Sequence, residues 1–178
     1  DTAAFSRALE VDPVPYPAPV FAPPIWEEGA LILTRKQVAR LARPILAVNA
    51  VAQVTIPQRE YPLALMAQAL EELLHRGVVR GIVLLGDNHS RSCHGPLVKK
   101  LGSGVVDLSS VLSLTASVAL MKECDAVLSI DGGLLHASFA TDLPVIAIYG
   151  PTDVYCQDPR GESGGYVPIS AFADCRCL

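Results

Sequence analysis

The sequence AVLSIDGGLLHASFA, residues 126–140, contains a complete strand-to-helix transition, and PVIAIY at residues 144–149 follows it closely. Residues 126–130 are apolar or small, as in a strand that is buried on both faces. Asp-Gly-Gly at 131–133 interrupts this run, residues 134–140 predict a short helix, and the later run predicts a second buried strand. Two apolar strands joined by a helix are typical of a parallel sheet.

The same alternation is present upstream. Residues 45–48 and 81–86 are apolar runs that predict two more buried strands. Between them a helix is expected to begin at Pro62 and to stop at Gly77. Its apolar face repeats at helical spacing and consists of Leu63, Met66, Leu70, Leu73 and Leu74. A second helical pattern runs through Val118 and Met121. We therefore predict an α/β fold, a Rossmann-like parallel sheet with helices on both faces.

Six of the fourteen prolines lie in the first thirty residues. Proline fixes φ and removes a backbone donor, so this stretch is expected to run as an extended arm. A short helix is predicted over residues 33–41. We therefore divide the chain into a proline-rich linker or arm at residues 1–43 and a Rossmann-like domain at residues 44–178. The pattern fades after Gly150, and we expect the domain to be cut short at its C-terminal side.

The composition excludes several functional classes. The formal net charge is −4 and basic residues do not cluster, which argues against a nucleic-acid partner. No apolar stretch reaches the roughly 18–20 residues that span a bilayer, and the N-terminus lacks the layout of a signal peptide. We expect a cytoplasmic protein.

The five cysteines are an odd number in a chain that is not small, which argues against a disulfide scaffold. Cys124 lies in an apolar pattern and is expected in the core. Cys175 and Cys177, with Cys156 nearby, leave a redox or metal role open, although a zinc site requires a fuller ligand set. Our expectation is that the protein uses no cofactor and no metal.

Three predicted strands end in glycine-bearing loops, at residues 85–88, 130–133 and 149–153. In an open parallel sheet, ligands bind beyond the carboxyl ends of the strands. Gly132 and Gly133 let a ligand approach the backbone, and the free amides and dipole of the following helix favour a diphosphate. Simpler alternatives are that Asp131 only caps the helix, that the glycines only form a tight turn, and that His136 is an ordinary half-buried residue.

The segment DAVLSIDGGLLHASFATDLPVIAIYGPTD, residues 125–153, resembles the heptosyltransferases of glycosyltransferase family nine. Their C-terminal domain carries an Asp-x-Gly-x-x-His loop, an alanine-rich helix, a Pro-Val strand and a Gly-Pro-Thr-Asp turn. The resemblance extends upstream to REYP at residues 59–62, where the family has Lys-Arg-Trp-Pro, to GIVLLGDN at residues 81–88, and to a divergent SLTA at residues 113–116. It covers residues 44–153.

This resemblance implies the C-terminal half of a GT-B fold, in which two Rossmann-like domains face each other across a cleft. It also implies that this half binds a nucleotide-sugar donor, typically ADP-heptose. The substrate-binding residues carried over from the family motifs are Arg59, Asp131, Gly132, Gly133, Leu134, His136, Thr152 and Asp153. Arg59 stands where the family has a lysine, and it offers a fork of donors in place of a point charge.

By the same resemblance, the reaction is an inverting, metal-independent glycosyl transfer to a glycan or glycolipid acceptor in lipopolysaccharide or related synthesis. Enzymes of this kind act on lipid-linked acceptors, which places the protein at the inner face of the membrane. The general base is expected on a missing N-terminal domain, so the catalytic residues stay unknown and this chain alone lacks the base. The alternative is a non-catalytic nucleotide-binding or interaction module with the same fold.

Overall fold

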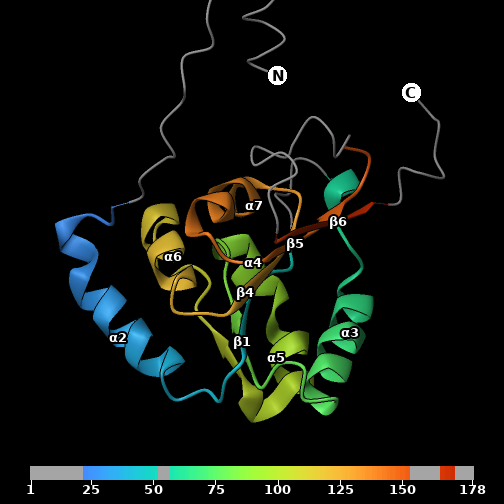
Figure 1. Cartoon of the computed structure of the whole chain (residues 1–178), viewed down its shortest axis with the longest axis horizontal. Helices are drawn as coiled ribbons and strands as arrows, with labels where there is room; N and C mark the ends of the chain where they lie inside the picture. The colour runs from blue at the N-terminus through green and yellow to red at the C-terminus, as the bar shows by residue number, and fades with distance from the viewer. Residues whose placement is uncertain (1–21, 52–56, 153–164, 171–178) are drawn as a thin grey trace, which may run out of the picture.

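The computed structural model describes residues 22–51, 57–152 and 165–170, which form one six-stranded sheet (Figure 1). All neighbouring strands are parallel, in the order β3-β2-β1-β4-β5-β6. The strands are β1 (Ile45–Asn49), β2 (Gly81–Leu84), β3 (Val105–Asp107), β4 (Ala126–Ile130), β5 (Val145–Tyr149) and β6 (Tyr166–Ser170). This is the order of a doubly wound nucleotide-binding sheet, so the predicted Rossmann-like α/β fold is confirmed.

Helices cover both faces of this sheet. The α-helices are α2 (Glu28–Val38), α3 (Leu63–His75), α4 (Asn88–Cys93), α5 (Gly95–Leu101), α6 (Leu114–Met121) and α7 (Gly133–Ser138). Short 3₁₀ turns are η1 (Ile25–Glu27), η2 (Pro57–Arg59), η3 (Gly102–Gly104) and η4 (Phe139–Thr141). Within the described ranges, no helix is both long enough and apolar enough to cross a bilayer.

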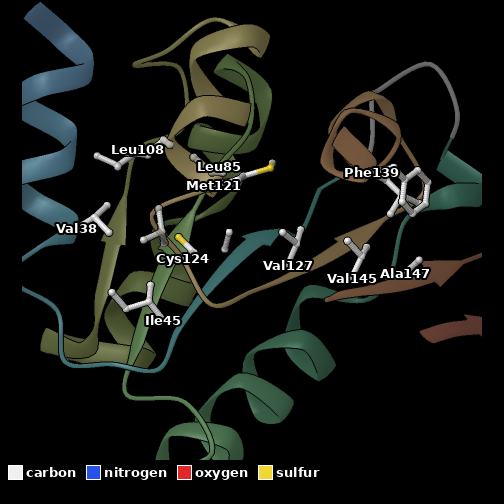
Figure 2. Packing of buried hydrophobic residues seen from close by; sticks show 14 of the residues in the cluster. Val38, Ile45, Leu85, Leu108, Met121, Cys124, Val127, Phe139, Val145 and Ala147 are labelled. Atoms are coloured by element: carbon white, nitrogen blue, oxygen red, sulfur yellow. The ribbon is translucent and has the colours of Figure 1, made fainter. Parts of the chain in front are cut away.

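The alternation of side chains along β1 shows how the two cores form. Ile45 and Ala47 join a cluster with residues of α2, α6 and α7, whereas Leu46 and Val48 join one with residues of α3 and α5. Figure 2 shows part of the first cluster, where Val38 of α2 and Met121 of α6 lie over the sheet. Because β1 is buried on both faces, its continuous apolar run in the sequence is explained.

The predicted helix after Pro62 is present as α3. Pro62 is its N-cap, one residue before the first helical residue. At the other end Gly77 adopts a left-handed φ of +67°. Its N–H donates to the carbonyl of Leu74, and the N–H of Val78 donates to that of Leu73, which is the Schellman arrangement. The glycine therefore ends the helix as predicted.

The helix predicted over residues 33–41 lies earlier, as α2. Leu31, Thr34 and Val38 are buried at helical spacing, and they pack this helix onto the first cluster, close to α6. The glutamate at its start, Glu27, also accepts hydrogen bonds from the N–H and hydroxyl of Ser113, the N-cap of α6. This part of the predicted arm is thus packed on the domain; residues 1–21 lie outside the described residues.

Of the α-helices and strands described, four were not predicted: α4, α5, β3 and β6. The segment NHSRSC of α4 has no apolar periodicity, and its helix begins because the Asp87 carboxylate accepts the N–H of Ser90. β3 has only three residues. β6 is an edge strand that is largely exposed and contains Pro168, so its sequence signal is weak.

Cys124 lies in the first cluster, 3% exposed, as predicted (Figure 2). Burial raises the pKa of its thiol to about 12, so the thiol is protonated and unreactive at neutral pH. Cys156, Cys175 and Cys177 lie outside the described residues, and their redox or metal role stays an open prediction.

We expect Leu70→Ala to lower the free energy of unfolding by about 2–5 kcal/mol, because Leu70 is 0% exposed in the second cluster and its removal leaves a cavity. Leu65→Ala on the same helix is the matched control, since Leu65 is 47% exposed, and should change stability far less. Urea denaturation measures both. Equal losses would contradict the assigned orientation of α3.

Candidate functional site

A cavity of about 480 Å³ lies at the edge of the sheet where the parallel strands end. Residues that end or follow four strands line it: Asn49 ends β1, Gly86 follows β2, Ser110 follows β3 and Gly133 follows β4. Ser117 of α6 lines another wall. The chain turns in opposite directions after β1 and after β4, so the cavity lies at the switch point of the sheet, the usual place for a ligand in such folds.

The glycine corner between β4 and α7 is open to this cavity. Apart from its chain neighbours and its own helix backbone, a Cβ atom at Gly133 would meet no atom within 4 Å in the described ranges, so no described side chain fills the corner. Gly132 has an extended backbone and is the N-cap of α7, and no side chain caps the helix. The alternative in which Asp131 caps the helix is therefore wrong. Since α7 has only six residues, its first amides matter here more than its dipole.

The Asp131 carboxylate instead lies at the centre of a polar cluster. It is 1% exposed, and its Oδ2 is 3.1 Å from Nε of Arg59 and accepts the Thr152 hydroxyl at 2.5 Å. Its Oδ1 has no hydrogen-bond partner among the described residues and is 3.9 Å from Nε2 of His136. A buried carboxylate needs such partners because burial in the protein removes its hydration.

The predicted site residues thus fall into two adjoining groups. Gly132, Gly133 and Leu134 line the cavity. Arg59, Thr152 and His136 surround Asp131. Asp153 lies outside the described residues.

The third glycine loop, after β5, has a different structural role. A Cβ atom at Gly150 would lie 2.5 Å from the carbonyl oxygen of Gln58 and 3.4 Å from Cα of Arg59. The loop and η2 therefore touch through their backbones. This close approach is what brings Arg59, far away in the sequence, to Asp131.

Charge is distributed unevenly between the two groups. Among the described residues that line the cavity, Asp87 is the only charged one. Hydrogen bonds from Ser90 lower the pKa of its carboxyl, so Asp87 is negative at neutral pH. Arg59 and His136 lie instead around Asp131, at the glycine corner. The interior of the cavity is thus suited to a neutral polar group, and the corner is the better place for an anion.

Several cavity residues were missed from the sequence. Asn49 is almost fully buried and donates to the Ser129 hydroxyl of β4 at 3.1 Å. Asp87 and Asn88 lie in a glycine loop that the sequence analysis noted but did not assign to the site. Their position in the sequence could have indicated them, because polar residues that follow parallel strands all reach the same edge of the sheet. Ser110 follows a strand that was not predicted, so it had no such signal.

Comparisons with known proteins agree with this architecture. The sequence profile described as glycosyltransferase family 9 (heptosyltransferase) matches residues 6–167. The chain is 30% identical over 174 residues to lipooligosaccharide heptosyltransferase 2 of Haemophilus influenzae, covering 91% of this chain and 49% of that protein.

Two solved structures share the fold. One is the ADP-heptose lipopolysaccharide heptosyltransferase II of E. coli, with a TM-score of 0.64 and 23% identity over 80% of this chain and 43% of that one. The other is E. coli heptosyltransferase WaaC with ADP-2-deoxy-2-fluoro heptose, with a TM-score of 0.60 and 19% identity over 93% and 46%. The chain spans about half the length of these relatives.

We expect Asp131→Asn to lower the free energy of unfolding by about 1–3 kcal/mol, because the buried negative charge that forms the ion pair with Arg59 is lost. The loss should stay below that of a fully buried pair, since Arg59 is 33% exposed. Glu72→Gln, in the exposed Arg76 pair, is the control and should change little. Thermal or urea unfolding of the unmodified chain and the two variants checks this. An Asp131→Asn protein as stable as the unmodified chain would contradict it.

Proposed function

Because the chain belongs to glycosyltransferase family 9, we propose that it forms the donor-binding half of a heptosyltransferase that acts in lipopolysaccharide or related glycan synthesis. The observation that carries this proposal is the open cavity at the switch point, bordered by the unfilled corner at Gly133. The donor is a nucleotide sugar, ADP-heptose in the first instance. A relative of the same fold is described with an ADP-heptose analogue, which supports that choice.

The distribution of charge suggests how the donor is oriented. The nucleoside enters the cavity, where the Asp87 carboxylate accepts hydrogen bonds from ribose hydroxyls, a common role for an acidic residue at this edge. Leu112, Leu114 and Leu134 supply apolar surface for the base. The diphosphate then lies at the glycine corner, near Arg59 and His136. Only Nε of Arg59 is paired with Asp131, so its other N–H groups can bind phosphate oxygens.

In this arrangement the chain stabilises the leaving group. An acceptor hydroxyl attacks the anomeric carbon with inversion, and the bond to the diphosphate breaks. The negative charge that grows on the diphosphate is met by Arg59, by His136 and by the amides at Gly133, without a metal. Asp131 holds Arg59 in place and itself accepts the Thr152 hydroxyl; Asp153, which lies outside the described residues, keeps its predicted donor-binding role. The general base that takes the acceptor proton belongs to the facing N-terminal domain, and the acceptor is a lipid-linked glycan at the cytoplasmic face of the membrane.

Isothermal titration calorimetry with ADP, UDP and GDP tests the donor site. We expect ADP to bind, and we expect Gly133→Val to weaken its affinity by at least about tenfold, because the added side chain occupies the open corner. Gly29→Val is the matched control: a Cβ there also meets open space, but it lies on α2, away from the cavity. Its ADP affinity should equal that of the unmodified chain.

If no nucleotide binds, the donor-binding role is wrong. If ADP binds but the Gly133→Val protein binds it equally well, the site lies elsewhere. Turnover of ADP-heptose after addition of the N-terminal half of a family relative then separates an enzyme half from a non-catalytic module.

A further inference from the structure

The wall of the cavity that follows β2 and β3 contains a residue in an unfavourable backbone conformation. Ser110 has a φ of +64°, in the left-handed region that residues with a side chain rarely adopt. In this conformation its N–H donates to the Gly86 carbonyl at 2.8 Å and its hydroxyl donates to Oδ1 of Asn88. All three residues line the cavity. The shape of this wall thus depends on Ser110 staying left-handed.

The preceding residue, Ser109, is fully buried and held on three sides. Its N–H donates to Oδ1 of Asp107 at 3.0 Å. Its carbonyl accepts a hydrogen bond from Nη1 of Arg91 at 2.9 Å. Its hydroxyl is 3.0 Å from Nδ1 of His94. With every polar group of Ser109 engaged, the backbone of the next residue has little freedom, and such restraint is what lets a strained conformation persist.

His94 links this hydrogen-bond network to helices α4 and α5. It connects α4 to α5 and is 0% exposed. Within the described part of the chain, its ring bonds only through Nδ1, to Ser109 and, at 3.4 Å, to Asp107, whereas its buried Nε2 has no partner there. Burial lowers the pKa of the ring, which is therefore neutral at pH 7. An unpaired buried ring nitrogen is unfavourable, and an apolar side chain of similar size would avoid it.

We propose that His94 is a positioning residue for the nucleotide site: through Nδ1 it holds Ser109, and thereby fixes the left-handed Ser110 that forms the cavity wall. That a nucleotide occupies the cavity rests on the function proposed above. The restraint on the wall rests on the hydrogen bonds alone.

Two substitutions at His94 distinguish the contribution of Nδ1 from that of Nε2. The side-chain amide of asparagine is as many bonds from Cα as Nδ1, whereas the terminal amide of glutamine corresponds to Nε2. His94→Asn therefore retains a group that can bond Ser109, and His94→Gln does not, although glutamine fills the buried space better. A role in packing alone predicts that the asparagine variant is the worse one. The positioning role predicts the opposite order.

The amide hydrogen exchange rate of Ser110 measures directly how firmly the cavity wall is held. In His94→Gln we expect the Ser110 amide to exchange at least about tenfold faster than in the unmodified chain, while Val48 in the sheet keeps its rate. His94→Asn should restore slow exchange at Ser110. Ser109→Ala serves as the second measurement, because without the hydroxyl the His94→Gln change should add nothing at Ser110. Unchanged exchange at Ser110, or equal acceleration at Val48, overturns the restraint.

Calorimetry with ADP then tests the consequence for the ligand. We expect affinity to fall at least about tenfold in His94→Gln and to stay within about threefold in His94→Asn. Equal affinity in the two variants overturns the positioning role. If the unmodified chain binds no ADP, the proposed function and the nucleotide-positioning role both fail, and the exchange data still decide separately whether His94 restrains the wall.

Discussion

The pairing of β1 with β4 is the constraint on which the rest of the structure depends. These strands are parallel and in register from Leu46 opposite Ala126 to Asn49 opposite Ser129, and a side-chain hydrogen bond closes the last pair. The chain leaves β1 toward one edge of the sheet and leaves β4 toward the other. The loops that follow must therefore separate, and they leave a hollow between them that packing does not fill. Any function that uses this hollow follows from the order of the strands.

Beside the hollow, the fold places a carboxylate where water cannot reach it. Asp131 follows β4 directly, and it is compatible with burial because Arg59 and Thr152 provide opposite charge and a hydroxyl. The guanidinium is in turn held in one orientation while part of it stays exposed. In the proposed donor site, a cation ordered in advance in this way would lose less side-chain entropy when it binds an anion. The buried charge of Asp131 is then what prepares Arg59 for that role.

The features that could be predicted from the sequence are those decided by residues close together in the chain. Gly77, Cys124 and the apolar strands were predicted because a turn conformation or a buried run is decided by neighbouring residues. The glycine corner at the end of β4 was found for the same reason. The ion pair between Arg59 and Asp131 could not be derived from spacing, because it requires η2 to return to the end of β4, and only the family resemblance placed both residues in one site. The left-handed Ser110 had no signal, since the α4 side chains that bond to it and to Ser109 lie 22 and 18 residues away in the sequence.

Gly150 shows how far the requirements of this site extend. It lines no described cavity wall, yet its Cα lies so close to the Gln58 carbonyl that even a methyl group would force η2 away. A displaced η2 would carry the Arg59 guanidinium off its carboxylate, while the sheet and the hollow kept their form. In a library of random variants, this position should therefore tolerate no replacement when selection is for the proposed donor binding, and many when selection is only for a folded, abundant protein. A residue can thus be needed for an ion pair beside a cavity that it does not line.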